Sequence, residues 1–411
     1  MTVALELLFW VAAATCLYAY AGYGVVIALL AKLRPAPVRS DDAYRPTVSL
    51  IICAYNEEAV IADKLENSLA LNYPADRLEI IVVSDGSTDR TPQLVEQYAG
   101  RHRGRRIVSL HQPERRGKPA AANRAATVAT GDIIVFSDAN SMYNPDSIAL
   151  MVRHFADPAV GCVAGEKRIR EVAGERVSHQ AGLYWRYESF LKKMDSAVWS
   201  VVGAAGEIMA VRRAVFTPPE PDSFIEDFIL SMRIAGQGYR VIYEPAAISL
   251  EEAPAADADE FERKARIAAG GFQSIVRLRG LLHPRHGLLA FQYISHRVLR
   301  WAVVPLLLPL LVGLNLLLLP SRPVLYGLTL LGQALLYGAA ALGMLLRDRP
   351  LGRVKFVSVP TYLVVMNLAV LAGLYRYLGG KQQVTWKKVA RSMGRPAAVM
   401  TDVATPGRSP R

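Results

Sequence analysis

The chain has 411 residues, of which 52% are hydrophobic and 20% are charged, and its formal net charge is +12. This length leaves room for more than one domain, and the hydrophobic share is high for a soluble protein. The excess cations lie beside apolar segments or at the ends of the polar region. Anionic lipid headgroups explain that placement at about 1 kcal/mol per charge, so nucleic acid is not an expected partner.

Four uncharged segments each reach the roughly 20 residues that a helix needs to cross a bilayer. They are residues 7–31, 301–321, 323–346 and 356–375. We interpret the first as an anchor rather than a cleaved signal peptide, because its positive charges, Lys32, Arg34 and Arg39, follow the apolar run. The same charges place the residues after this anchor in the cytoplasm.

The side of the membrane on which the chain ends stays open. Three crossings after a cytoplasmic region put the C-terminus outside. The late basic residues favour the inside; they are Arg376, Lys381, Lys387, Lys388 and Arg391. Either residues 356–375, which include Pro360 and Asn367, do not cross fully, or the charge rule fails here.

Strand patterns alternate with helical patterns after a linker at 35–46. Continuous apolar runs predict strands buried on both faces near residues 47–54, 78–85, 106–112 and 132–138. Helical patterns lie at 64–69, 91–100 and 119–129. This alternation predicts an α/β fold with a doubly wound sheet, which binds ligands at the carboxyl ends of its strands. Polar residues cluster at those ends: Asn56, Glu57, Asp85, Ser87, Asp89, Asp138 and Asn140.

The second half of the polar region is less regular. We expect an aromatic-rich helix at 178–199, a helix within 222–234 and a basic helix at 258–282. Residues 286–300 are amphipathic and are expected to lie in the membrane interface. The tail after Met393 has the composition of a disordered segment. Three isolated cysteines lack metal-binding spacing and are expected to be packing residues: Cys16, Cys53 and Cys162.

Two of the strand ends carry side chains suited to a nucleoside diphosphate. Asp85, in SDGSTD, could hydrogen-bond a nucleotide base while the turn amides face phosphate. The alternative is an ordinary turn in which Ser87 or Asp89 caps the next helix. Asp138 and Asn140 point the same way from an extended segment and could share one divalent cation, or could be ordinary loop and capping residues.

Three further motifs have both a chemical and a structural interpretation. Lys118 precedes an alanine-rich helix and could contact phosphate, or could be a solvated loop lysine. Glu226 and Asp227 begin a helix, where acids favour the dipole, and could supply a general base for a sugar hydroxyl. Arg263 and Arg266 share one helical face and could cover a departing diphosphate, or could meet lipid headgroups.

These motifs occur together in a recognisable order: VSLIICAYNEE, SDGSTD, RGKPAAAN, SDAN, IED and RKARIAAGGFQ. The set resembles the inverting family 2 glycosyltransferases, and within them the membrane branch of poly-N-acetylglucosamine, cellulose, chitin and hyaluronan synthases. The resemblance covers residues 44–300 and extends weakly to KQQVTWKKVAR. It implies a cytoplasmic, Rossmann-like GT-A domain (the nucleotide-diphospho-sugar transferase fold) combined with transmembrane helices. The implied divisions are an anchor and linker at 1–39, the GT-A domain at 40–285, an interfacial helix at 286–300, transmembrane segments at 301–378 and a basic tail at 379–411.

The resemblance also implies roles for individual residues. The nucleotide-sugar pocket would contain Ala54, Tyr55, Glu57, Asp85, Lys118, Asp138, Arg263 and Arg266. The metal, Mg²⁺ or Mn²⁺, would be held by Asp138 with Asn140 beside it. The catalytic base would be Asp227, with Glu226 next to it.

Two departures from the family pattern matter. Asn140 stands where a second aspartate is usual, so metal binding is expected to depend on Asp138. Polymerising members usually carry Q-x-x-R-W, whereas residues 263–267 read RKARI and lack the glutamine and the tryptophan. That tryptophan contributes to the acceptor site in the polymerases, so its absence puts processivity in doubt and leaves glycosyl transfer intact.

The resulting hypothesis is metal-dependent, inverting transfer from a nucleotide-diphosphate sugar, expected to be a UDP-sugar, to a growing surface polysaccharide. The reaction is expected at the inner face of the bacterial plasma membrane, in contact with membrane lipids, and a partner subunit is left open. The alternative is transfer of one sugar to a membrane lipid such as a ceramide, hopanoid or polyprenyl phosphate. A non-catalytic assembly or transport subunit is disfavoured because Asp85, Asp138 and Asp227 are all present. Three aromatic residues could stack on acceptor sugars or simply pack: Tyr184, Trp185 and Tyr187.

Overall fold

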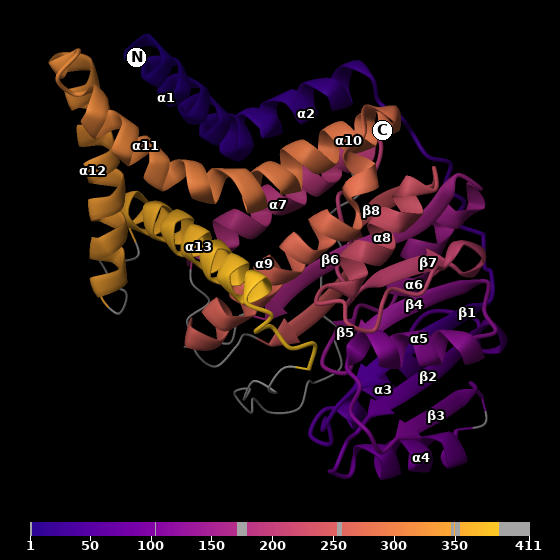
Figure 1. Cartoon of the computed structure of the whole chain (residues 1–411). Coiled ribbons are helices and arrows are strands. Elements are labelled where there is room, and N and C mark those ends of the chain that lie inside the picture. Colours follow the sequence, from indigo (N-terminus) through magenta and orange to yellow (C-terminus); the bar gives the residue numbers. More distant parts are fainter. Residues whose placement is uncertain are drawn as a thin grey trace.

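The computed structural model describes residues 2–102, 104–170, 179–252, 257–346, 349 and 354–385. Most of the predicted C-terminal tail, residues 386–411, lies outside the described residues. The described chain has two parts (Figure 1): a sheet with helices packed on it, and a group of long apolar helices at one side.

One eight-stranded sheet forms the centre of the molecule, in the order β3-β2-β1-β4-β7-β6-β8-β5. Its strands are β1 (Val48–Ala54), β2 (Leu78–Asp85), β3 (Ile107–Gln112), β4 (Ile133–Asp138), β5 (Met142–Tyr143), β6 (Val160–Arg170), β7 (Met209–Arg212) and β8 (Arg240–Glu252). The first four are parallel neighbours, which confirms the four predicted strands. Every residue of β2 is buried, as a continuous apolar run requires in a sheet covered on both faces.

The remaining strands make the sheet mixed, whereas the sequence pattern predicted only parallel strands. β7 runs antiparallel to both β4 and β6, and the short β5 runs antiparallel to β8. β6 and β8 are parallel to each other. None of these four strands was predicted: β5 and β7 have only two and four residues, and charged residues such as those in EKRIR, at the end of β6, interrupt the apolar runs of β6 and β8.

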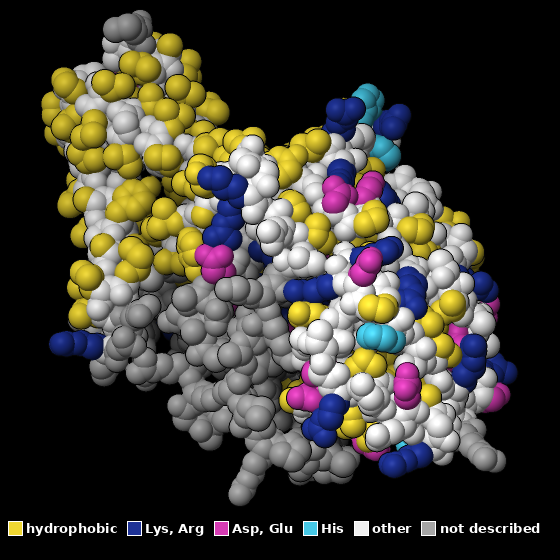
Figure 2. Space-filling view, turned by 60° about the horizontal axis from the view of Figure 1, so that its bottom comes forward, with side chains coloured by type: hydrophobic (Ala, Val, Ile, Leu, Met, Phe, Trp, Pro, Cys, Tyr) yellow, Lys and Arg dark blue, Asp and Glu magenta, His cyan; other side chains and the backbone are white. Residues whose placement is uncertain are grey.

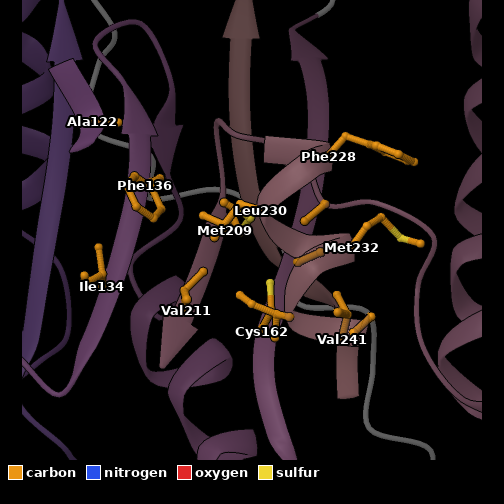
Figure 3. Close-up of a cluster of buried hydrophobic side chains, with 14 of the residues drawn as sticks. Ala122, Ile134, Phe136, Cys162, Met209, Val211, Phe228, Leu230, Met232 and Val241 are labelled. Carbon is orange, nitrogen blue, oxygen red and sulfur yellow. The ribbon is translucent and has the colours of Figure 1, made fainter. Parts of the chain in front are cut away.

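Helices cover both faces of the sheet and bury two separate hydrophobic cores. They are α3 (Ile61–Leu69), α4 (Thr91–Arg101), α5 (Lys118–Val128), α6 (Ser147–Val152) and α8 (Glu226–Gly236). The α5 and α8 side contains Phe136 of β4, Met209 of β7 and Leu230 of α8, which lie close together in Figure 3. Cys162 is buried in the same core, consistent with its expected packing role. The expected helices at 91–100 and 119–129 correspond to α4 and α5.

The apolar helices stand partly clear of the sheet, and hydrophobic side chains cover much of their visible surface (Figure 2). Four stretches are long and apolar enough to cross a membrane, in agreement with the four predicted segments: Thr2–Leu33, Leu288–Leu318, Pro323–Leu345 and Lys355–Leu378. Their elements are α1 (Thr2–Leu17), η1 (Tyr18–Gly22), α2 (Tyr23–Leu33), α10 (Leu288–Tyr293), η7 (Ile294–Val303), α11 (Val304–Leu318), α12 (Pro323–Leu345) and α13 (Lys355–Leu378). The expected interfacial segment at 286–300 is therefore continuous with α11. It includes the π-helical η7, a conformation that often marks functional sites.

A buried polar network joins the first apolar helix to the polar region through α7 (His179–Val198). The Tyr23 hydroxyl on α2 donates to Asp195 on α7. His296 Nδ1 on η7 lies 2.6 Å from Asp195 Oδ2, and its Nε2 lies 3.3 Å from Glu188 Oε1. Glu188 also pairs with Arg297 at 2.5 Å. Because these side chains are almost entirely buried, the network fixes η7 against α7.

Candidate active site

One cavity of about 500 Å³ opens at the carboxyl ends of β1, β2 and β4 and continues to the apolar helices. Every residue predicted for the site lines this cavity. These residues are Ala54, Tyr55, Glu57, Asp85, Lys118, Asp138, Asn140, Glu226, Asp227, Arg263 and Arg266. The parallel strands explain part of this convergence, because their carboxyl ends meet at one edge of the sheet.

The loops after β1 and β2 are joined by reciprocal hydrogen bonds at one end of the cavity. The Asn56 amide donates to Ser87 Oγ at 3.0 Å, and the Thr88 amide donates to Asn56 Oδ1 at 2.8 Å. Asp89 Oδ1 accepts from the Thr91 amide at 2.9 Å, at the start of α4. The capping interpretation of SDGSTD therefore holds for Asp89, whereas Ser87 binds the loop after β1.

Asp85 holds the loop that leads into α5. Its Oδ1 accepts from the Arg116 amide at 2.8 Å, and its Oδ2 accepts from the Gly117 amide at 2.7 Å. Gly117 has a φ of 92°, a conformation that favours glycine. The Arg115 guanidinium lies 3.6 Å from the centre of the Tyr55 ring. Both Asp85 oxygens thus organise backbone, and a base contact by this carboxylate remains a prediction.

Lys118 is the central cation of the cavity. It is the first residue of α5, and its Nζ lies 2.5 Å from Asp138 Oδ1 and 3.6 Å from Glu226 Oε1. Burial alone would lower the pKa of this ammonium, but Asp138 and Glu226 reverse the effect and hold that pKa well above its usual value. Lys118 therefore stays charged and can interact with an anionic ligand.

Two backbone amides orient the Asp227 carboxylate. The Gly206 amide donates to Oδ2 at 2.7 Å, and the Phe228 amide donates to Oδ1 at 2.8 Å. Burial raises the pKa of Asp227, and burial also raises the pKa of Glu226 to about 7. An acid with a raised pKa is a stronger base when ionised, so this environment suits a general base, and that role of Asp227 stays a prediction.

Several charged residues on the cavity wall were missed by the sequence analysis, and three of them form one ion-pair cluster. Lys167 Nζ lies 2.8 Å from Glu207 Oε1 and 2.6 Å from Glu251 Oε2. Burial would raise the pKa of Glu207, but Lys167 lowers it to about 2. Lys167 and Glu251 belong to β6 and β8, and Glu207 precedes β7. These residues could therefore be assigned to the cavity wall only once the positions of those strands were known. The one available signal was a charge directly after an apolar run, as in Glu166-Lys167.

The donor set around Asp138 suits a cation that takes most of its ligands from elsewhere. No group of three or more His, Cys, Asp or Glu side chains able to enclose an ion occurs in the part of the chain that the structure describes. Asp138 and Asn140 both line the cavity and carry a carboxylate and an amide oxygen. Mg²⁺ binds in this way, through one or two carboxylates together with phosphates and water. The residues present therefore fit a cation that arrives with a diphosphate.

The end of the cavity toward the apolar helices combines aromatic and apolar side chains with the cations Lys264 and Arg297. Trp185 of α7, Trp301 of η7 and Met366 of α13 line it. Trp301 packs on Phe228, with ring centres 5.1 Å apart. Because Phe228 follows Asp227 in the sequence, this end of the cavity lies next to Asp227. Trp301 was predicted only as part of an apolar segment.

The two arginines of RKAR lie in this same wall, on α9 (Asp257–Arg277). Arg263 Nε lies 2.9 Å from Glu260 Oε2, and Arg266 Nη1 donates to the Phe224 carbonyl at 3.1 Å. Tyr187, also considered for sugar stacking, instead donates to the Tyr20 carbonyl at 2.8 Å.

Comparison with known proteins agrees with this geometry. A family model described as "Glycosyl transferase family 2" matches residues 49–217. A poly-beta-1,6-N-acetyl-D-glucosamine synthase from Staphylococcus aureus is 27% identical over 234 residues, which cover 56% of this chain and 56% of that protein. A probable glycosyltransferase from Bacillus subtilis, YdaM, is 30% identical over 217 residues, covering 51% of each. The chain thus matches about half the length of these curated relatives.

A solved structure extends the similarity to most of the chain. The mannosyltransferase PcManGT from Pyrobaculum calidifontis, in complex with GDP-Man and Mn²⁺, has a TM-score of 0.68 and 27% sequence identity. The match covers 91% of this chain and 100% of that one. The chain therefore carries a family 2 glycosyltransferase domain, built on the GT-A fold.

Proposed function

We propose that this protein transfers a sugar, with inversion, from a nucleotide-diphosphate sugar to a growing surface polysaccharide at the inner face of the membrane. The observation that carries the proposal is the convergence of Lys118, Asp138 and Asp227 in one cavity that continues to candidate membrane helices. The S. aureus relative is named as a polysaccharide synthase, which favours a polymeric product. A UDP-sugar is the expected donor, and the GDP-Man bound to PcManGT makes a GDP-sugar the alternative to test.

The chemistry follows from the two groups at the centre of the cavity. Lys118 stabilises the negative charge that develops on the departing diphosphate, and Arg266 lies in the same wall. A divalent cation at Asp138 would add a Lewis acid that neutralises the same charge. The acceptor oxygen bonds to the anomeric carbon as the bond from that carbon to the diphosphate oxygen breaks. The acceptor proton passes to Asp227, whose two oxygens are held in place by the Gly206 and Phe228 amides.

A lipid acceptor is the second candidate. Met366 and Val370 of α13 line the same cavity, so an acceptor headgroup could enter from the membrane side. The loss of Q-x-x-R-W favours single transfer as well. In this version the product is one sugar on a membrane lipid rather than a chain of sugars.

Labelled donors test both versions. Protein purified in detergent is incubated with radiolabelled UDP- and GDP-sugars, Mg²⁺ or Mn²⁺, and membrane lipid extract, and the products are sized by gel and by lipid chromatography. A high-molecular-mass product supports the polysaccharide, and a labelled lipid supports the alternative. Asp227→Asn serves as the matched inactive control. Equal incorporation by Asp227→Asn and the unmodified protein would sink the assignment of the base, and no incorporation from any donor would sink the activity.

A further inference from the structure

α13 is long and apolar enough to cross a membrane, yet its C-terminal half packs along α9 of the glycosyltransferase region. A Cβ added to Gly373 would lie 2.6 Å from the Ala265 carbonyl oxygen, so the two helices are in close contact there. Arg376 Nη2 pairs with Glu262 Oε1 at 2.8 Å. These contacts place the end of α13 directly on the polar part of the protein.

The middle of α13 also faces the polar part. Met366 and Val370 line the cavity that contains Lys118 and Asp227. A helix that crosses a bilayer places its middle about 15 Å from either boundary of the hydrocarbon core. A cavity that receives a charged diphosphate cannot lie at that depth, because an unpaired buried charge is too costly. The middle of α13 is therefore near the membrane surface.

The chain after α13 returns to the nucleotide end of the cavity. Val384 and Thr385 both line it. A Cβ added to Gly117, the residue before Lys118, would lie 2.9 Å from Val384 Cγ1. Residues 381–385 are thus on the same side of the membrane as the glycosyltransferase domain.

We propose that α13 does not cross the membrane but lies on its surface, with one face forming a wall of the catalytic cavity and the other covered by lipid. The outward face is apolar and exposed, with Phe356 87%, Leu368 46% and Leu378 74% accessible. It continues the lipid-facing surface of α12, against which α13 packs. Lys355 and Lys381 lie at the two ends of the helix, where they can pair with anionic headgroups.

This arrangement explains the late basic residues. If α11 and α12 cross as a hairpin and α13 does not cross, the chain ends on the same side as the glycosyltransferase domain. Arg376 and Lys381 then lie on the cytoplasmic side, as the charge bias favours. The inference needs no assumption about the sugar or the acceptor.

Labelling of single added cysteines tests the sidedness. The reporters are Glu96→Cys on the exposed face of α4, Ser321→Cys between α11 and α12, Lys355→Cys and Lys381→Cys. Each is treated with a membrane-impermeant maleimide in right-side-out spheroplasts and in inverted vesicles, and the unmodified protein measures labelling of its own three cysteines. We expect positions 96, 355 and 381 to react from one face and position 321 from the other. Reaction of position 355 or 381 from the face opposite to position 96 overturns the proposal.

Depth measurement provides a second test that does not depend on sidedness. A nitroxide at Leu368→Cys, midway along α13, is compared with one at Leu335→Cys, midway along α12; both side chains are exposed. Relaxation by oxygen and by a headgroup-anchored nickel chelate reports the depth of each label in vesicles. We expect Leu335→Cys to be deep and Leu368→Cys to be shallow. Equal depths contradict the proposal.

Discussion

Lys118 Nζ lies 2.5 Å from Asp138 Oδ1 and 3.6 Å from Glu226 Oε1. One ammonium therefore joins the carboxylate expected at the metal to the acid beside the expected base. A diphosphate that enters the cavity brings negative charge of its own, and Lys118 must then serve both the ligand and its protein partners. Donor binding is therefore coupled, through Lys118, to the ionisation of Asp138 and Glu226.

The first prediction concerns Lys118→Met, which removes this charge and keeps most of the side-chain volume. We expect donor affinity to fall by roughly tenfold to a hundredfold, because a hydrogen bond to a charged group contributes about 1.5–3 kcal/mol. Titration calorimetry with the nucleoside diphosphate measures the loss. Lys118→Arg, which keeps the charge, should retain more of the affinity. Unchanged binding by Lys118→Met would show that the ammonium does not contact the donor.

The second prediction follows from the raised pKa of Glu226, about 7 against an ordinary value of 4.5. The folded protein binds this proton more tightly than the unfolded chain. The stability that the neutral acid contributes is therefore complete below about pH 4.5 and is lost as the pH rises to about 7. Glu226→Gln stays neutral throughout. The free energy of unfolding of the variant relative to the wild type should rise across this window by about 3 kcal/mol, since one pKa unit corresponds to about 1.4 kcal/mol.

Thermal unfolding in detergent between pH 4 and pH 8 measures this difference. Glu96→Gln, on the exposed face of α4, is the matched control for the substitution itself. A Glu226→Gln difference that does not change with pH would mean that Glu226 ionises as it does in the unfolded chain.

The fold could be predicted where burial on both faces produced an uninterrupted apolar run. β1, β2 and β4 meet that condition, and they also carry Ala54, Asp85 and Asp138 at their ends. β6 and β8 are long strands that leave the core and become charged, so their sequences lack both the continuous run and a clean alternation. Their absence from the prediction made an all-parallel sheet the only available interpretation.

The candidate site could be predicted from the joint order of several short motifs, none of which is decisive alone. Asp227 was selected because of the other motifs around it and not because an acidic pair begins a helix, and its orientation depends on the Gly206 amide, twenty-one residues earlier. The partners of Lys167, and the approach of Trp301 to the cavity, likewise depend on tertiary packing. Long-range contacts of this kind have no local periodicity, so a single sequence cannot reveal them.

The third prediction concerns Gly206, whose amide holds Asp227. A Cβ at this position would lie 3.1 Å from Asp227 Oδ2 and 3.2 Å from Lys118 Nζ. Gly206→Ala should displace the carboxylate by a few tenths of an ångström and lower kcat, because a displacement of about 1 Å can cost about a hundredfold. Affinity for the nucleoside diphosphate should change less.

Steady-state kinetics with the donor identified in the labelling assay separates these effects. Gly100→Ala on α4 is the control, since an added Cβ there meets no atom within 4 Å. A Gly206→Ala variant with normal kcat would show that the position of the Asp227 carboxylate tolerates this change.

The fourth prediction concerns Asp195, the residue that joins α2, α7 and η7. Its carboxylate accepts from the Tyr23 hydroxyl and lies 2.6 Å from His296 Nδ1, and both it and His296 are wholly buried. Asp195→Ala should lower the free energy of unfolding by roughly 3–5 kcal/mol, because removing this carboxylate leaves the Tyr23 hydroxyl and the His296 ring buried without their partner. Asp76→Ala, at an exposed aspartate in the 3₁₀ turn Ala75–Arg77, should have little effect. Thermal unfolding of both variants in the same detergent measures the difference. Equal midpoints would show that the network adds nothing to the attachment of α2. A much lower midpoint for Asp195→Ala alone would show that the first apolar helix is held to the glycosyltransferase domain through this carboxylate.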